Sequence, residues 1–327
     1  MLLEKIKKYK QSFIPVVITG VLLSIVQLKV DNPMIILERF INRGGWIEIA
    51  LLSLYAGFLF FKMKDVNKTS YWRKFSWAVF SIVFFIQLVL GLFGFEKFLM
   101  SGKLHFPIPA MIAAGAVYRF EFSFMPILFL STVLLSGPAW CSQLCYFGAW
   151  DNIAALGKTK NTILKNKNLI KHSFLFLVIF TAIILRIFNL PLIYIIVFAS
   201  IVGITGVAII VFISPKNKKM IHCISYCPIG TLIMYFKQIS PFRMHIDNSC
   251  TNCMRCTGYC KYDALSKNDI QKRKPALSCT YCGDCLVSCK TDSIKYKFLN
   301  LSSEASRNLY LIISISLHAI FLGLARI

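Results

Sequence analysis

The 327-residue sequence lacks the short motifs that bind several common cofactors. It has no C-x-x-C-H haem attachment site, no glycine-rich dinucleotide fingerprint and no P-loop, and no two histidines face each other within apolar segments to ligate a haem. Acidic residues are also few, since 14 Asp and Glu stand against 37 Lys and Arg, which gives a formal net charge of +23. No DNA-binding motif accompanies this positive charge, so we expect no nucleic-acid partner.

Apolar residues, in contrast, make up 57% of the chain, and the mean hydropathy is +0.64. Several runs of about 17 or more residues carry almost no charge, and a helix of that length crosses a hydrocarbon core roughly 30 Å thick. This excludes a soluble all-helical protein, a disordered tail and a secreted disulfide scaffold. We therefore predict an α-helical polytopic membrane protein whose lipid contacts are made by about seven spans. The predicted spans are residues 13–29, 46–61, 75–94, 122–139, 173–189, 191–213 and 308–325.

Basic residues concentrate in the segments that share one side of these spans. With the N-terminus inside, segments 1–12, 62–74, 138–172 and 215–307 hold 4, 5, 5 and 15 Lys and Arg, which is 29 of the 37. Cytoplasmic loops of membrane proteins carry such an excess of basic residues. We therefore predict a cytoplasmic N-terminus, and every cysteine then lies at or beyond the cytoplasmic face.

The twelve cysteines all fall into clusters, and eight of them form two C-x2-C-x2-C-x3-C motifs at an offset of 29 residues. In two-cluster ferredoxins this spacing binds iron–sulfur clusters, and the fourth cysteine ligates the other cluster. Zinc sites usually draw on two separated pairs of ligands, so zinc suits this spacing poorly. We predict two [4Fe–4S] clusters in a small α+β dicluster ferredoxin-like domain at 245–298. The predicted ligands are Cys250, Cys253, Cys256 and Cys289 for one cluster, and Cys279, Cys282, Cys285 and Cys260 for the other.

The other four cysteines form two C-x3-C pairs, Cys141 with Cys145 and Cys223 with Cys227, each just after a predicted span. On a helix, positions i and i+4 share a face with Cβ atoms about 6 Å apart. That separation is long for a relaxed disulfide and suits two thiolates on one shared centre. We predict that the four cysteines bind a third iron–sulfur centre, [2Fe–2S] or [4Fe–4S], at the cytoplasmic edge of the bilayer. The alternatives are a dithiol and small buried thiols that pack as apolar residues.

Three other features give weaker hypotheses. Lys261 and Lys290 replace the proline that usually follows the fourth cysteine, and their charge would raise the cluster potentials. The loop 95–121, in which Pro107 and Pro109 break any simple helix, is either an interfacial plug or one wall of a quinone site. His318 is a lone histidine in the last span, either functional or held by nearby serines. The residues that belong to these alternatives are His105, Tyr118 and Arg119 in the loop, and Ser314 and Ser316 beside His318.

Two hairpins at 75–139 and 173–227, each ending in a C-x3-C pair, precede the dicluster domain. This arrangement resembles the polyferredoxin-like membrane family of NapH-type quinol dehydrogenase subunits, the C-terminal half of NosR-type proteins and CcoG-type assembly proteins. The resemblance covers about 75–298. The family element W-C-x-x-x-C-P-x-G is matched first by Trp140, Cys141, Cys145 and Gly148, with Tyr146 in place of Pro, and then by Cys223, Cys227, Pro228 and Gly230.

The resemblance implies a prokaryotic inner-membrane subunit that carries electrons through iron–sulfur centres, as an electron-transfer component of an oxidoreductase system. Without haem or nucleotide motifs, electrons enter or leave by contact with quinone or with another protein. Segment 247–298 carries nine basic and five acidic residues, which favours an acidic ferredoxin, a flavodoxin or a flavoprotein as the redox partner. Two alternatives are a CcoG-type reductase of copper during assembly and a NosR-like redox-sensing regulator.

We assign no catalytic residue, and we divide the chain into four parts. They are a two-span extension at 1–74, a four-span core at 75–244, the ferredoxin-type domain at 245–298 and a final span at 299–327.

Overall fold

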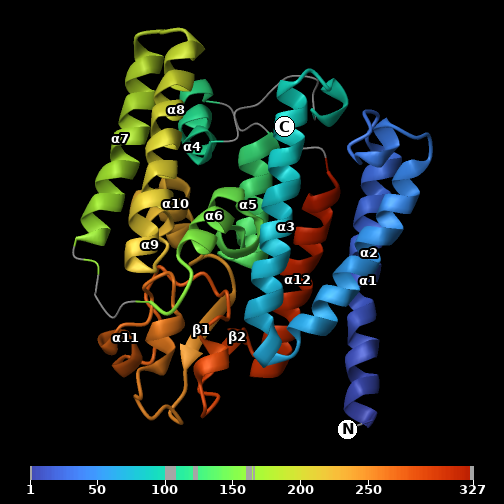
Figure 1. Ribbon diagram of the computed structural model, residues 1–327, viewed down its shortest axis with the longest axis vertical. Coiled ribbons are helices and arrows are strands. Elements are labelled where there is room, and N and C mark those ends of the chain that lie inside the picture. The colour runs from blue at the N-terminus through green and yellow to red at the C-terminus, as the bar shows by residue number, and fades with distance from the viewer. Residues whose placement is uncertain (1, 100–107, 121–123, 160–163, 165, 325–327) are drawn as a thin grey trace. The chain divides into compact units, whose positions relative to one another are not determined.

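The computed structural model describes residues 2–99, 108–120, 124–159, 164 and 166–324. Within these residues the chain forms twelve α-helices and two short β-strands, so it is mostly helical (Figure 1). Two compact units are present, one made of Met1–His105 with Glu304–Ile327 and the other of Phe106–Ser303. The four-part division of the chain expected from the sequence stays a prediction.

Among the described residues, six helices are long and apolar enough to cross a membrane. They are Tyr9–Lys29, Gly44–Met63, Val66–Leu92, Lys167–Ile187, Leu192–Asn217 and Ser303–Gly323. Within the fourth predicted span, 122–139, the described residues form the 13-residue helix α5 (Phe124–Ser136), about 20 Å long at 1.5 Å per residue. It ends early because Gly137 takes a positive φ of 60° just before Pro138. The structure thus has six helices of spanning length where the sequence predicts seven.

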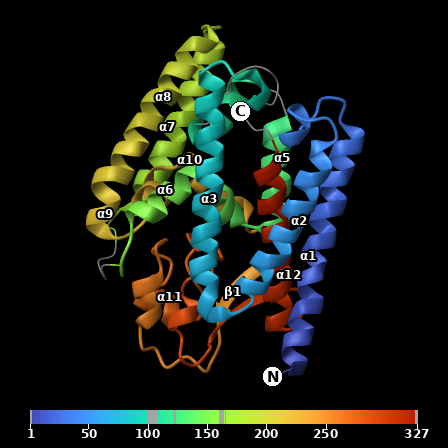
Figure 2. The same ribbon diagram turned by 45° about the vertical axis from the view of Figure 1, so that its right-hand side comes forward.

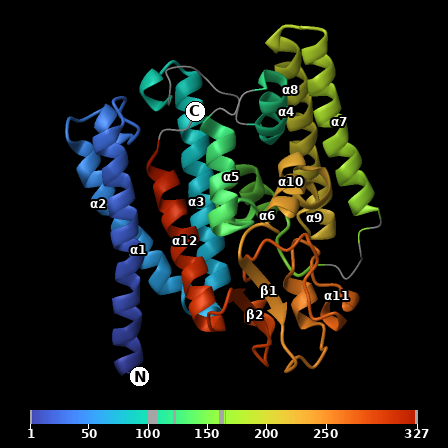
Figure 3. The ribbon, with the colours of Figure 1, turned by 180° about the vertical axis from the view of Figure 1, so that it is seen from behind.

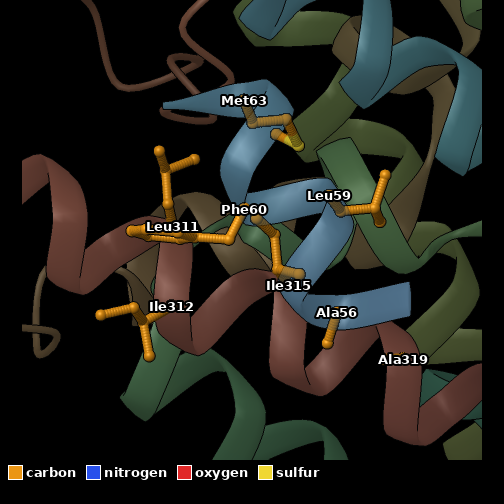
Figure 4. Close-up of a cluster of buried hydrophobic side chains, with 8 residues drawn as sticks. All are labelled: Ala56, Leu59, Phe60, Met63, Leu311, Ile312, Ile315 and Ala319. Carbon is orange, nitrogen blue, oxygen red and sulfur yellow. The ribbon is translucent and has the colours of Figure 1, made fainter. Parts of the chain in front are cut away.

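The first unit contains α1 (Leu2–Lys29), α2 (Gly44–Met63), α3 (Val66–Leu92) and α12 (Ser303–Gly323). Its best-defined core lies between α2 and α12, whose apolar side chains recur at helical spacing. Figure 4 shows these side chains, which are Ala56, Leu59, Phe60, Met63, Leu311, Ile312, Ile315 and Ala319. His318 lies in the same helix, and its Nε2 is 3.2 Å from the Tyr55 hydroxyl. A tyrosine is therefore a hydrogen-bond partner of His318.

The second unit holds the remaining helices, and in it α7 (Lys167–Ile187) and α8 (Leu192–Ala208) lie side by side with α4 (Pro109–Arg119) against them (Figures 1 and 2). Pro109 starts α4 rather than breaking it, because proline is tolerated at the first helical position. The Tyr118 hydroxyl donates to the Leu190 carbonyl, so it anchors α4 to the α7–α8 connection. His105, another of the three candidates in this loop, lies outside the described residues.

The segment with the ferredoxin motifs forms one end of the second unit (Figure 3). Strand β1 (Phe242–Ile246) pairs antiparallel with β2 (Ile294–Phe298). Between them, α11 (Lys267–Gln271) starts at a capping box made by Ser266 and Asp269. The short helix α11 follows the first motif, and strand β2 follows the second.

Candidate iron–sulfur site

Each C-x3-C pair lies in a π-helical turn that leads into a short helix. The turn η3 (Trp140–Leu144) precedes α6 (Tyr146–Ala154), and η5 (His222–Tyr226) precedes α10 (Pro228–Phe236). In both copies the N–H of the second cysteine donates to the carbonyl five residues earlier at 2.8 Å. The sequence predicts an ordinary helix face for each pair, which is wrong, since the turns are wider. Such π-turns occur frequently at functional sites.

The four thiols of the two pairs line one cavity, although the second pair follows the first by 82 residues. Burial raises the pKa of Cys145 to about 11 and that of Cys227 to about 12, and repulsion among the neighbouring thiols adds to the burial effect for Cys227. A thiolate in such a site needs a compensating positive charge, which a bound metal centre supplies. The possible metal ligands among the lining residues are four cysteines and His222, with no carboxylate, and the four thiolates fit an iron–sulfur centre.

Backbone N–H groups of the following helices point at the second sulfur of each pair. The Gly230 N–H lies 3.4 Å from the Cys227 sulfur, and the Gly148 and Phe147 N–H groups stabilise the thiolate form of Cys145. A Cβ at position 230 would come within 2.8 Å of the Cys223 carbonyl oxygen, so this place requires glycine. Hydrogen bonds to sulfur stabilise and tune iron–sulfur centres, which gives the glycine of the C-x3-C-P-x-G pattern a physical role.

Asp151 is a buried residue of this site that the sequence analysis missed. Its carboxylate accepts hydrogen bonds from the Ser214 hydroxyl at 2.5 Å and from the Cys223 N–H at 3.0 Å. Burial raises the pKa of Asp151 to about 6, and these hydrogen bonds act in the opposite direction. Asp151 therefore ties the helix after the first pair to the turn of the second. One sequence feature could have identified Asp151: it is an acidic residue just after an apolar stretch, in a chain that has few acidic residues.

The cysteines of the ferredoxin motifs also gather in two sets. Cys260, Cys279, Cys282 and Cys285 line a second cavity, and the Cys256 thiol lies among those of Cys250, Cys253 and Cys289. The structure thus brings together the members of each predicted ligand set, including the crossed fourth cysteines. The Ala264 N–H is 3.2 Å from the Cys260 sulfur, and the Ser293 N–H is 3.3 Å from the Cys289 sulfur. These are equivalent positions, because each amide follows its cysteine by four residues.

Direct hydrogen bonds join the C-x3-C pairs to the ferredoxin motifs. The Tyr262 hydroxyl donates to the Cys141 carbonyl at 2.8 Å, and the Ser142 hydroxyl donates to the Thr280 carbonyl at 3.3 Å. The Lys237 ammonium donates to the Cys279 carbonyl at 2.7 Å. Within this unit, the C-x3-C cavity is therefore next to the set that contains Cys279.

The two lysines after the motifs differ in their surroundings. Lys261 is buried, and its ammonium donates to the carbonyls of Ala155 and Gly157 and, at 3.3 Å, to that of Lys218. Lys290 is exposed. Lys261 therefore attaches the ferredoxin motifs to the end of α6, and its predicted effect on a cluster potential stays a prediction.

A single metal ion has no ready-made site among the described residues. No group of three or more His, Cys, Asp or Glu side chains in that part of the chain is arranged to hold one ion.

Comparison with known proteins finds a family described as a 4Fe-4S binding domain, which matches residues 119–162 and 199–246. Both matched segments carry a C-x3-C pair, and they take in η3, α6, η5 and α10. The comparisons with curated proteins and with solved structures give no match. The chain therefore contains a 4Fe–4S binding domain, and that domain includes the cavity lined by the four C-x3-C cysteines.

Proposed function

We propose that this chain is a membrane-bound electron-transfer subunit that passes electrons between quinol, or a redox partner, and cytoplasmic-side [4Fe–4S] clusters. The observation that carries the proposal is that the three cysteine sets follow one another within the second unit. They lead from the C-x3-C cavity to the set of Cys279 and then to the set of the exposed Cys253. The 4Fe–4S family match supports the iron–sulfur chemistry. Six apolar helices support a place in a lipid bilayer.

Each cysteine set has the donors that an iron–sulfur centre requires. The two ferredoxin sets hold two [4Fe–4S] clusters in this proposal, and the C-x3-C set holds a third centre. When bound, each centre supplies a one-electron carrier. The protein contributes the N–H groups at Cys145, Cys227, Cys260 and Cys289, and apolar side chains that keep water from the C-x3-C cavity.

The exposure of the cysteines suggests where a redox partner binds. Cys227 and Cys285 are buried, whereas Cys253 is exposed. A protein that exchanges electrons by contact must approach a centre closely, so we place it at the Cys253 side of the ferredoxin motifs. The excess of basic residues in 247–298 fits an acidic ferredoxin, a flavodoxin or a flavoprotein. In this proposal the N-terminus and these motifs are cytoplasmic, and quinol approaches from the bilayer.

The test is to purify the full chain anaerobically in detergent and to measure iron, acid-labile sulfide and zinc. We expect about twelve irons if all three centres are [4Fe–4S], or about ten if the third is [2Fe–2S]. A quinol analogue or a reduced acidic ferredoxin should then generate the EPR signals of reduced clusters. Protein that contains zinc in place of iron, or clusters that neither reductant reduces, would contradict the proposal.

A further inference from the structure

Two buried lysines face a cavity between the C-x3-C pairs and the ferredoxin motifs. Lys171 and Lys237 are each 5% exposed, and both line this cavity. Cys141, Cys223 and Cys279 line it too, so the cavity touches two of the three cysteine sets. None of its lining residues is an aspartate or a glutamate.

The Lys237 ammonium is held toward both cysteine sets. It donates to the Cys279 carbonyl at 2.7 Å and lies 5.2 Å from the centre of the Tyr281 ring. Burial raises the pKa of the Cys141 and Cys279 thiols, and the positive charge of Lys237 acts in the opposite direction on both. Lys171 is less directly engaged, because its ammonium lies 2.8 Å from the Met234 sulfur, a weak acceptor.

Burying two ammonium groups without a carboxylate is costly unless negative charge lies nearby. No acidic side chain of the cavity wall supplies that charge. Iron–sulfur centres do supply it, since an oxidised [4Fe–4S] cluster with four thiolates carries about −2 and gains one more negative charge on reduction. The position of the lysines is therefore explained by anionic centres on both sides of them.

We propose that Lys237, assisted by Lys171, is a positioning charge that raises the reduction potentials of both flanking centres. The inference rests on the proposed function, because it requires bound clusters. A positive charge in a low-dielectric site stabilises the added electron more strongly than the same charge in water. Lys237 lies in range of both flanking sets, so it shifts the two potentials together. The set with Cys253 lies beyond the Cys279 set, so the Lys237 charge changes its reduction potential least.

The experiment is an EPR-monitored redox titration of the full chain in detergent. Lys237→Met should lower the reduction equilibrium constants of the two flanking centres about tenfold, which is 59 mV for a one-electron couple. Lys237→Arg keeps the charge and should hold both potentials near those of the wild type. Lys274→Met is the matched control, because Lys274 is exposed and water screens its charge.

A Lys237→Met protein with unchanged iron content and unchanged potentials overturns the inference. An equal shift caused by Lys274→Met also overturns it, because the effect would then be a general one of net charge. If Lys237→Met loses iron, Lys171→Met decides: it should lower the potential of a flanking centre, and no shift there overturns the proposal. Wild-type protein without clusters contradicts the proposed function itself, which the iron assay registers separately.

Discussion

The Tyr262 hydroxyl donates a hydrogen bond to the Cys141 carbonyl at 2.8 Å, although 121 residues separate the two. Tyr262 follows Cys260 by two residues, so this side-chain hydrogen bond links the segment of one cysteine set to the backbone of another. It is a short path between the C-x3-C cavity and the ferredoxin motifs.

Replacing Tyr262 by Phe removes this bond and keeps the ring. We expect a loss of about 1 kcal/mol in the free energy of unfolding, the usual net value of a hydrogen bond. Iron content should stay unchanged, and reduction of the ferredoxin signals by a quinol analogue should become slower. Stopped-flow spectroscopy measures that rate. An equally large effect of Tyr259→Phe, at a partly exposed tyrosine close by, would argue against a specific path.

Replacing Cys145 or Cys227 by Ser should remove only the iron of the third centre. We expect a fall from about twelve or ten irons to about eight, with the EPR signals of the ferredoxin clusters retained. Ser225→Ala is the control, because Ser225 lies in the same turn and its hydroxyl donates only to the Ile221 carbonyl. An iron content that starts near eight and is unaffected by either cysteine change would return these thiols to a dithiol or packing role.

The hydrogen bonds of Asp151 give a further prediction, because its carboxylate accepts two of them inside the protein. Asp151→Ala leaves the Ser214 hydroxyl and the Cys223 N–H without this acceptor, and an unsatisfied buried group costs about 1–3 kcal/mol. We expect a lower melting temperature and loss of third-centre iron, with the ferredoxin clusters kept. Asp151→Asn retains one oxygen acceptor and should be milder. Equal effects of the two changes in iron and melting assays would show that the acceptor is not what matters.

Asp263 joins the ferredoxin motifs to two lysines near the membrane helices. Its carboxylate oxygens lie 2.7 Å from the Lys167 ammonium and 2.6 Å from that of Lys219. Asp263→Asn should increase proteolysis of the ferredoxin segment, because the buried Lys219 and the half-buried Lys167 then lose this counter-charge. Asparagine tolerates the positive φ of this position, so backbone strain does not confuse the result.

The control for Asp263 is Asp247→Asn. Asp247 pairs with Lys295 at 3.2 Å, and both side chains are about one-third exposed. An exposed pair of this kind contributes roughly 0–1 kcal/mol. Comparable proteolysis of the two variants would mean that the buried position of Asp263 has no special importance.

The distribution of basic residues predicts the topology of the chain. Reporter fusions after Lys103 should report an external position, and fusions after Lys165 a cytoplasmic one, because 29 of 37 Lys and Arg then lie inside. Alkaline phosphatase and green fluorescent protein fusions give opposite readouts at each site. The reverse pattern would move every cysteine set to the outer face.

Hydropathy and cysteine spacing are local properties, and they account for what could be predicted. Six of the seven predicted spans correspond to helices of spanning length, because an apolar run that must satisfy its own backbone in lipid becomes a helix. Hydropathy registers the apolar run at 122–139 but not the positive φ of Gly137, just before which α5 ends. Spacing alone was enough to group the eight ferredoxin cysteines into the two sets that lie together.

Long-range packing decided the rest. The spacing of the cysteines does not predict the π-turn that each C-x3-C pair adopts. Asp151 meets Cys223 across 72 residues, and Lys237 meets Cys279 across 42. Such contacts form only when separate helices pack, because side chains that are distant in sequence become neighbours through burial. Spacing could therefore predict which thiols lie together, whereas only the packed structure decided which charges and hydrogen bonds surround them.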